Sequence, residues 1–192
     1  MNILSIDIDY AYSPTISSYD DYVVGSKISL EEQEKLIKQK GLPSPKVNNS
    51  KLEILREVLD KKTGPKVPLN ISSHHHSILH FLPTDTSFSI YNFDHHHDIY
   101  YPGWHSLEEL DEGNWVFHTE HELIDKYVWF CNEDSEQIED ISVVSFPVEI
   151  VTEVVLPSLP NFDMVFCCYS PHWTGDSGRK NLVKILRSDN EL

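Results

Sequence analysis

The spacing of apolar residues along this chain predicts short strands that alternate with helices. Apolar stretches of strand length recur and are separated by polar, turn-forming segments. The segments expected to form strands are Met1–Ile8, Val67–Ser72, Phe88–Phe93, Asn114–Phe117, Tyr127–Phe130 and Asp163–Tyr169. The segment Asp140–Val155 is also rich in strand-forming residues, but Pro147 interrupts it because proline cannot donate to a strand ladder.

Three further segments carry the apolar spacing and the end signals of helices. Ser29 begins the first, with Glu32 three residues later in capping-box position, and Gly41 marks its end. The second helix is expected over Ser50–Lys62 and the third over Arg179–Arg187. The apolar face of the second helix consists of Leu52, Leu55, Val58 and Leu59.

The order of these elements favours an α/β fold in which a mostly parallel sheet is the middle of three layers. Met1–Ile8 and Asp163–Tyr169 are almost continuously apolar, which is typical of parallel strands buried on both faces. The length of 192 residues suits one domain, so residues 1–192 are expected to form a single domain. In such sheets ligands bind outside the carboxyl ends of the strands. Polar residues that follow the strands are therefore candidate site residues.

Acidic residues and histidines follow two of the predicted strands at regular spacing. Asp7 and Asp9 are two residues apart, so in an extended chain they would project to the same side. Asp94, His96 and Asp98 repeat that spacing directly after a later strand. Carboxylates mixed with neutral imidazoles suit divalent metals such as Mn, Fe, Co or Zn. These five residues are predicted to be metal ligands.

A run of three histidines follows the Val67–Ser72 strand and can supply a sixth ligand. His76 is the preferred ligand, and His75 competes with it for that role. The remaining histidines near the site are expected to pack behind the ligands; they are His74, His95 and His97. Four carboxylates brought together are unfavourable without bound cations. Two divalent ions would neutralise them, so a paired metal site is expected.

The net charge of −16 narrows the classes of partner. With 31 acidic residues against 15 basic ones, the chain lacks the basic face that phosphate binding needs, which argues against nucleic acid. The acidic balance would instead attract metal ions or a basic substrate. The apolar runs are far shorter than the roughly 20 residues of a membrane helix. The N-terminus also lacks the basic start of a signal peptide, so a cytoplasmic protein is expected.

These motifs resemble the ureohydrolase (arginase–agmatinase) and histone-deacetylase-like fold. Asp94, His96 and Asp98 match its Asp-x-His-x-Asp motif, His76 matches its histidine after an earlier strand, and the Asp-x-Asp pair is also present. In arginases the Asp-x-Asp strand comes late in the chain, whereas here it is first, so a shortened relative with rearranged strand order is expected. The chain most resembles the peptide arginases of ribosomal-peptide maturation (RiPP biosynthesis) and their uncharacterised homologues. The similarity covers the metal strands and Asn114–Phe130, and Glu112-Gly-Asn-Trp115 also fits it.

The resemblance implies a hydrolase with two Mn²⁺ ions that converts arginine side chains to ornithine and urea. A hydroxide shared between the metals would attack the guanidinium carbon, since bound metals lower the pKa of water. The short chain implies an open site, and together with the acidic balance this favours a cationic, arginine-containing precursor peptide as partner. The sequence carries no signal for the oligomeric state.

The same chemistry requires a proton donor and a guanidinium-binding group. A histidine must protonate the leaving amine, and the candidates are His118, His121 and His172. A carboxylate is expected to hold the planar guanidinium by paired hydrogen bonds, and Asp176 or Glu149 could supply it. Trp173 is a candidate for stacking on the cation.

Three alternative functions fit the same motifs. One is a ureohydrolase on a free small guanidino compound, and a second is a deacetylase-like amide hydrolase with one zinc ion. A third is a non-enzymatic module that uses metal only for folding, with a closed coordination shell. The second acidic residue of the Asp7 and Asp9 pair favours two metals over one.

Overall fold

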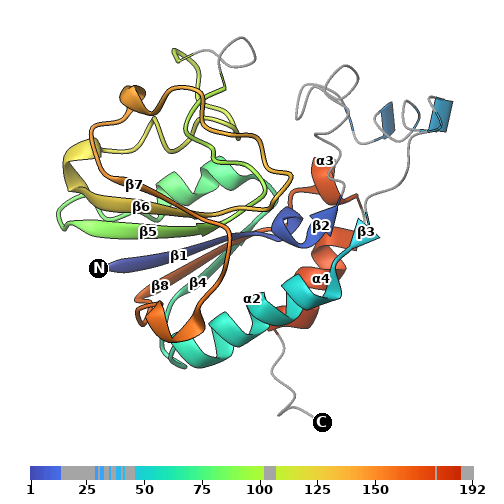
Figure 1. Ribbon diagram of the computed structural model, residues 1–192, viewed down its shortest axis with the longest axis horizontal. Coiled ribbons are helices and arrows are strands. Elements are labelled where there is room, and N and C mark those ends of the chain that lie inside the picture. The colour runs from blue at the N-terminus through green and yellow to red at the C-terminus, as the bar shows by residue number, and fades with distance from the viewer. Residues whose placement is uncertain are drawn as a thin grey trace.

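A six-stranded parallel sheet organises the described part of the chain (Figure 1). The computed structural model describes residues 1–13, 29, 31–32, 35, 38–39, 41, 46–101, 107–175 and 177–186. The strands of the sheet, in the order in which they pair, are β4 (Leu69–Ser72), β8 (Met164–Cys168), β1 (Asn2–Asp7), β5 (Phe88–Phe93), β6 (Ile124–Phe130) and β7 (Val148–Val151). All five pairings are parallel. The prediction of a mostly parallel α/β sheet is therefore confirmed.

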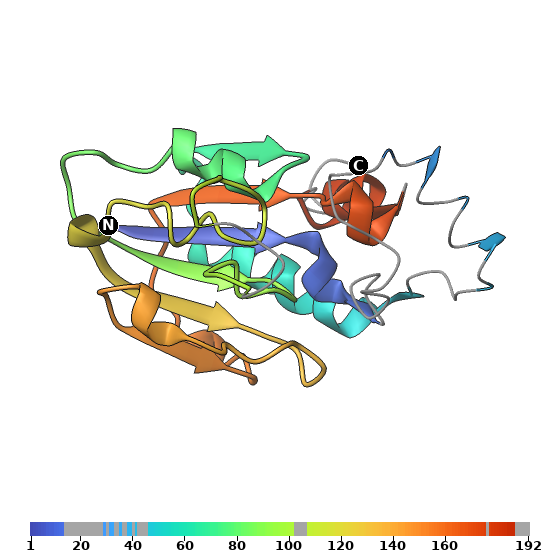
Figure 2. The same cartoon turned by 90° about the horizontal axis from the view of Figure 1, so that it is seen from above.

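The parallel order brings the carboxyl ends of the strands to one edge of the sheet, where the strand arrows point in Figure 2. Asp7 is level with Cys168 of β8, and Ile6 is level with Phe93 of β5. The residues that follow β5 therefore emerge beside Asp7. The residues that follow β4 emerge at the same edge, on the other side of β1 from β5, because β4 and β8 lie on that side of β1.

Two helices cover one face of the sheet. α2 (Asn49–Lys62) buries Leu52, Leu55, Val58 and Leu59, as its apolar spacing predicts. The side chain of Asn48 caps it by accepting hydrogen bonds from the backbone N–H groups of Ser50 and Lys51, which satisfies donors that have no partner within the helix. α4 (Ser177–Leu186) packs beside α2 against the same core. None of the helices in the described ranges is both long and apolar enough to cross a membrane.

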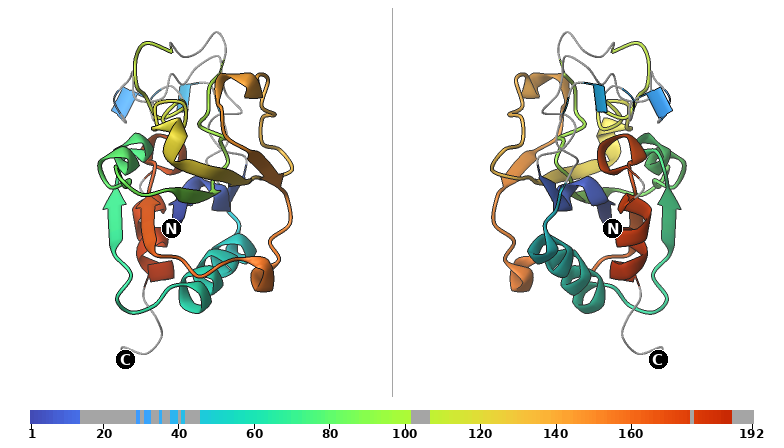
Figure 3. Two further views of the ribbon diagram at one scale, coloured as in Figure 1. Left: turned by 90° about the vertical axis from the view of Figure 1, so that its left-hand side faces the viewer. Right: turned by 90° about the vertical axis from the view of Figure 1, so that its right-hand side faces the viewer.

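The opposite face is covered by 3-10 helices and turns rather than by α-helices, as far as the chain is described. Viewed along the strands, η4 (His75–His80) and η5 (His121–Leu123) lie across the sheet from α2 and α4 (Figure 3). Trp115, Val116 and Phe146 fill the core on this side. A sheet with a covering layer on each face is compatible with a three-layer fold.

One predicted strand segment is not a strand, and a second is a strand only after the predicted interruption at Pro147. Residues 114–117 form turns, and within Asp140–Val155 only Val148–Val151 is a strand, next to the short 3-10 helix η6 (Ile141–Val143). The physical reason is that Trp115 and Val116 are apolar because they cover the sheet, with no exposed surface, and not because they pair within it. Apolar runs of four residues do not distinguish these two roles.

Some predictions fall outside the described residues or on their margins. The predicted capping box is confirmed: Glu32 N–H donates to Ser29 Oγ (3.3 Å), and Ser29 N–H donates to the Glu32 carboxylate (3.0 Å). In the helix expected to end near Gly41, the described residues 31–32, 35 and 38–39 are helical, whereas the residues between them lie outside the described part, as does Asp176. A short antiparallel pair, β2 (Tyr12–Ser13) and β3 (Lys46–Val47), flanks the undescribed region.

Replacing Gly178 with alanine is expected to destabilise the fold by about 1–3 kcal/mol through overpacking. A Cβ on this α4 residue would lie 2.0 Å from Thr174 Oγ1 and 2.4 Å from the Tyr169 carbonyl oxygen, and the carbonyl belongs to backbone that cannot rotate away. The matched control is Gly64→Ala, where the nearest atom, Val67 Cγ2, is 3.9 Å away. Urea unfolding of both variants measures the difference, and equal midpoints would contradict the expected clash.

Candidate metal centre

Asp7 and Asp9 enter the site from the turn that ends β1. Asp7 is the last residue of the strand, and the chain passes at once into the 3-10 helix η1 (Ile8–Ala11). The Asp7 carboxylate caps this helix, because its Oδ1 accepts a hydrogen bond from the Asp9 backbone N–H at 3.1 Å. The expectation of an extended segment through Asp9 is therefore wrong. Both carboxylates still reach one buried cluster.

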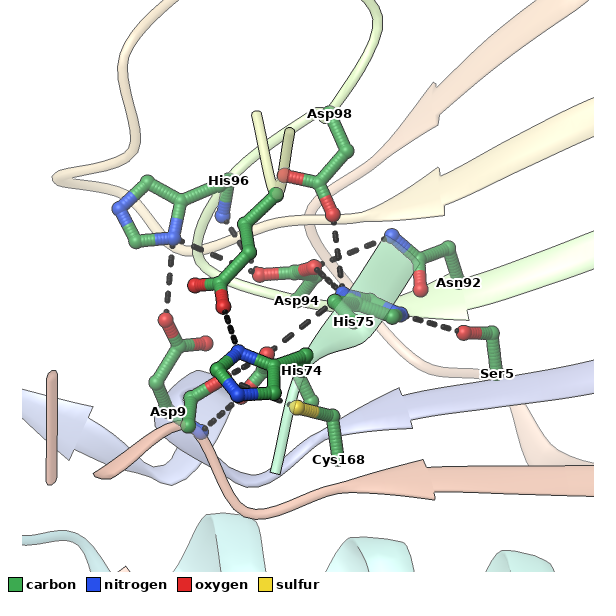
Figure 4. Close-up of polar contacts among 12 residues, drawn as sticks. Ser5, Asp9, His74, His75, Asn92, Asp94, His96, Asp98 and Cys168 are labelled. Carbon is green, nitrogen blue, oxygen red and sulfur yellow. Dashed lines mark hydrogen bonds and ion pairs between the residues drawn. The ribbon is translucent and has the colours of Figure 1, made fainter. Parts of the chain in front are cut away.

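His75, and not His76, lies in the middle of the carboxylates (Figure 4). Its Nδ1 lies 2.9 Å from Asp94 Oδ2, 2.9 Å from Asp98 Oδ2 and 3.5 Å from Asp7 Oδ2.

The preference for His76 is corrected by this geometry. His76 is half-buried, and its ring stacks on that of His74 with centroids 5.6 Å apart. η4 begins at His75, and successive side chains of a 3-10 helix point about 120° apart. The start of the helix thus decides which histidine faces the acids, and a run of three identical residues does not reveal that start.

A second group of ligand atoms lies beside the first. His96 Nδ1 lies 3.0 Å from Asp9 Oδ2 and 3.6 Å from Asp94 Oδ1. The ligand atoms of Asp9, Asp94 and His96 are all within 4.8 Å of one another, and the same holds for Asp7, His75 and Asp94. Asp94 belongs to both groups, with one oxygen facing each histidine. The predicted ligands Asp7, Asp9, Asp94 and His96 are therefore brought together, and the cluster could hold a metal ion.

Asp98 joins the cluster from a strained backbone position. It has φ of +54°, in the left-handed region that few residues other than glycine, asparagine and aspartate adopt, at a cost of roughly 1–2 kcal/mol. Its Oδ2 accepts a hydrogen bond from Trp115 Nε1 at 2.6 Å and lies beside His75 Nδ1. Strain of this kind is retained where the surrounding contacts require one side-chain direction. Here that direction is toward His75.

Burial and mutual repulsion shift the pKa values of the carboxylates in the cluster. Burial raises the pKa of Asp7 and of Asp98 well above the ordinary value, and nearby carboxylates add to the rise. Burial, followed by the charge of Asp94, raises the pKa of Asp9 to about 6. For Asp94, burial also favours the neutral acid, but hydrogen bonds from His75 and His96 outweigh it and hold the pKa well below its ordinary value. The nearby positive charges are therefore too few to keep all four acids ionised.

The two histidines respond in the opposite sense. Burial favours neutral rings, but the hydrogen bonds of His75 to Asp94 and Asp98 raise its pKa well above 6.5. The charge of Asp9 has the same effect on the pKa of His96. With all four acids ionised, four carboxylates would face two imidazolium rings in a buried site, and the raised pKa values of Asp7, Asp9 and Asp98 reflect the cost of that excess negative charge. A bound divalent cation would offset this excess negative charge and stabilise the ionised carboxylates.

Buried polar side chains orient the ligands from behind. Asn92 Nδ2 donates to Asp94 Oδ2 (3.3 Å) and to Tyr127 Oη (2.8 Å). The hydroxyl of Ser170, which follows β8, donates to Asp7 Oδ2. Sequence reasoning missed Asn92, Tyr127 and Ser170 as parts of the site. A signal for Asn92 was available, because it is an amide within a strand that is otherwise buried and mostly apolar.

The histidines expected to pack behind the ligands lie around the site, and the His95 ring packs edge-on against that of His96, with centroids 5.1 Å apart. His95 Nδ1 lies 3.1 Å from the Asn132 side-chain amide. His97 Nδ1 accepts a hydrogen bond from the Ile99 backbone N–H at 3.1 Å, and its ring stacks on Tyr101. His74 Nδ1 pairs with Glu112 at 2.5 Å.

The candidate substrate residues are only partly brought to the cluster. Trp173, in the short helix α3 (Pro171–Thr174), lies against His96 with ring centroids 4.9 Å apart, and His172 precedes it, buried in the same helix. Glu149 lies near the start of the edge strand β7 and pairs with Lys126 at 3.3 Å. It is therefore placed on the far part of the sheet and not at the cluster.

The other two histidines proposed as proton donors lie in the segment after Trp115. His118 follows it in the same turn. His121 begins η5, and its Nε2 lies 2.9 Å from the Phe117 carbonyl oxygen. In the described part of the chain, neither forms a hydrogen bond or ion pair with a carboxylate of the cluster.

Comparisons with protein-family models, with curated protein sequences and with solved structures find no match to this chain.

Proposed function

We propose that this chain is a metal-dependent hydrolase of the arginase type that converts arginine side chains of a peptide to ornithine and urea. The observation that carries the proposal is the pair of ligand groups that share Asp94. A carboxylate with one oxygen in each group suits two adjacent divalent ions, for which Mn²⁺ is the proposed metal. The sheet order supports a rearranged ureohydrolase fold, because it places the residues after β4, β1 and β5 at one edge.

Each of the two ligand groups would hold one cation. His75, Asp7, Asp94 and Asp98 would hold one cation, and Asp9, Asp94 and His96 the other. When bound, the pair of cations lowers the pKa of water and so supplies a nucleophile at neutral pH.

Trp173 is the proposed contact for the substrate cation, because its ring lies beside His96 and an aromatic face attracts a guanidinium. Of the two proposed guanidinium carboxylates, the geometry does not support Glu149, which pairs with Lys126, and Asp176 remains the proposal.

His172 and His118 are the proposed proton donors to the leaving amine. Each lies in the same short segment as a tryptophan that contacts a residue of the cluster. His172 adjoins Trp173, which contacts His96, and His118 shares a turn with Trp115, which donates to Asp98. The net charge of −16 supports a cationic precursor peptide as the substrate and argues against nucleic acid as a partner. We also propose a cytoplasmic location without a membrane partner.

Incubation of the purified chain with Mn²⁺ and an arginine-containing peptide tests the activity. The expected product has lost one CH₂N₂ unit for each converted arginine, detected by mass spectrometry, and urea appears in equal amount. Metal analysis of the same sample should give two ions for each chain. A peptide with lysine in place of arginine is the matched substrate control and should not change in mass.

The alternatives predict different results in the same assay. Turnover of free arginine or agmatine with no change in any peptide would move the assignment to a small-molecule ureohydrolase. One zinc for each chain with release of acetate from acetyl-lysine would indicate a deacetylase-like hydrolase. An Asp9→Ala variant that unfolds, instead of folding without activity, would favour a metal that serves only folding.

A further inference from the structure

Ser5 is a fully buried serine in the middle of β1, between the apolar residues Leu4 and Ile6. Because side chains alternate along β1, Leu4 and Ile6 face the core beneath α2 and α4, whereas Ser5 shares the opposite face with Ile3 and Asp7. A hydroxyl buried without a hydrogen-bond partner costs roughly 1–3 kcal/mol in proteins. A serine at this position therefore needs a specific partner.

The partner of Ser5 is His75. Ser5 Oγ lies 2.7 Å from His75 Nε2, on the side of the ring away from the carboxylates (Figure 4). The opposite nitrogen, Nδ1, faces Asp94 and Asp98 at 2.9 Å. The imidazole is held between aromatic rings, with Phe166 parallel to it at 5.9 Å and Trp115 at 5.1 Å between centroids. The two nitrogens of His75 thus have fixed and different neighbours.

We propose that Ser5 is a positioning residue that holds His75 in the tautomer whose Nδ1 binds metal, an inference that rests on the metal centre proposed above. An imidazole that binds a metal through one nitrogen carries its remaining proton on the other. With Nδ1 among the carboxylates, that proton is on Nε2 and is donated to Ser5 Oγ. Without the hydroxyl, the Nε2 proton would be buried with no acceptor among its described neighbours.

Removal of the hydroxyl is expected to weaken metal binding about 10- to 100-fold, the usual effect of losing a partner of a metal-binding histidine. The variant is Ser5→Ala, and Ser5→Thr should restore most of the affinity because it keeps the hydroxyl and suits a strand. The matched control is Ser89→Ala, which removes another buried strand serine at the opposite end of β5. Calorimetric titration with Mn²⁺ measures the affinity of each folded variant.

The tautomer itself is measured on the unaltered chain, so the test does not depend on the folding of a variant. The chain is loaded with Zn²⁺, which is diamagnetic, and ¹⁵N NMR is expected to show a protonated Nε2 and a metal-bound Nδ1 for His75. A proton on Nδ1, or unchanged Mn²⁺ affinity in Ser5→Ala, would overturn the role of Ser5 while leaving the metal centre in place. A folded chain that binds neither metal would instead contradict the proposed function, and the role of Ser5 with it.

Discussion

Replacing Asp94 with asparagine is expected to lower the hydrolase activity at least about a thousandfold and to reduce the number of bound metal ions. The expected loss corresponds to several kcal/mol of transition-state stabilisation, the usual contribution of a catalytic metal. Asparagine keeps the shape of the side chain but removes the charge that both ligand groups share. No other described carboxylate occurs in both groups, so no neighbour can replace it.

The fold of this variant should survive the loss of one hydrogen bond, that from Asn92 Nδ2, which would face the new amide nitrogen in place of Oδ2. The backbone N–H of His96, which donates to Asp94 Oδ1 at 2.8 Å, retains an oxygen acceptor. Circular dichroism and urea unfolding check the fold, and metal analysis counts the ions. The control is Asp85→Asn, an exposed aspartate that should leave both activity and metal content unchanged. Two metal ions and full activity in Asp94→Asn would contradict the shared-ligand geometry.

Manganese is expected to stabilise the chain more strongly at about pH 8 than at about pH 5, because protons and metal compete for the same ligands. At a metal concentration of about 100 times Kd the gain is about 2.7 kcal/mol. For a chain of this size that gain corresponds to a rise in Tm of roughly 5–10 °C. The gain should shrink toward low pH as the ligands bind protons instead.

The metal-free chain should show the opposite trend, losing stability as the pH rises. The pKa of Asp9 is raised from 3.8 in the unfolded chain to about 6 in the fold, so Asp9 takes up a proton on folding between these two pH values. As the pH rises from 3.8 to about 6, about 3 kcal/mol of the free energy of unfolding is therefore lost. His75 and His96 have raised pKa values, and their stabilisation, complete below the unfolded value of 6.5, is lost above it. Asp94 has a lowered pKa and acts in the opposite sense, but only below its ordinary value of 3.8.

Unfolding measured with EDTA and with excess Mn²⁺ at both pH values tests this pair of trends. The expected result is two curves of stability against pH that diverge as the pH rises. Parallel curves would show that the cluster does not exchange protons for metal. An Asp9→Asn variant serves as the comparison, since it should flatten the metal-free curve between about pH 4 and pH 6.

The sequence predicts best those elements whose signal is local. α2 was expected at Ser50–Lys62 and occurs at Asn49–Lys62, because four apolar residues at helical spacing and an end signal agree. β5 has the predicted bounds, Phe88–Phe93. The polar residues directly after β1 and β5 could be assigned to one site because parallel strands end at one edge of a sheet.

The parts that could not be predicted depend on contacts between distant segments. His75 faces the acids because a 3-10 helix begins there, and that start depends on how the chain packs over Phe166 of β8. The apolar residues around Trp115 predict a strand, but the segment is a turn. Trp115 is buried by contact with His75 and Tyr127 and not by strand pairing, and the sequence does not reveal such contacts. Glu149 was a candidate from its residue type alone, and only the sheet order shows how far along the sheet it lies.

The position of β8 has a consequence for the synthesis of the protein. Every proposed metal ligand has been translated once the chain reaches Asp98, yet β8, which separates β4 from β1 and carries Ser170 beside Asp7, begins only at Met164. A nascent chain therefore holds all of its metal-binding side chains before it has the strand that aligns them. Since such long-range pairing is late in folding, metal capture is expected only after β8 has been synthesised and has paired with β1 and β4.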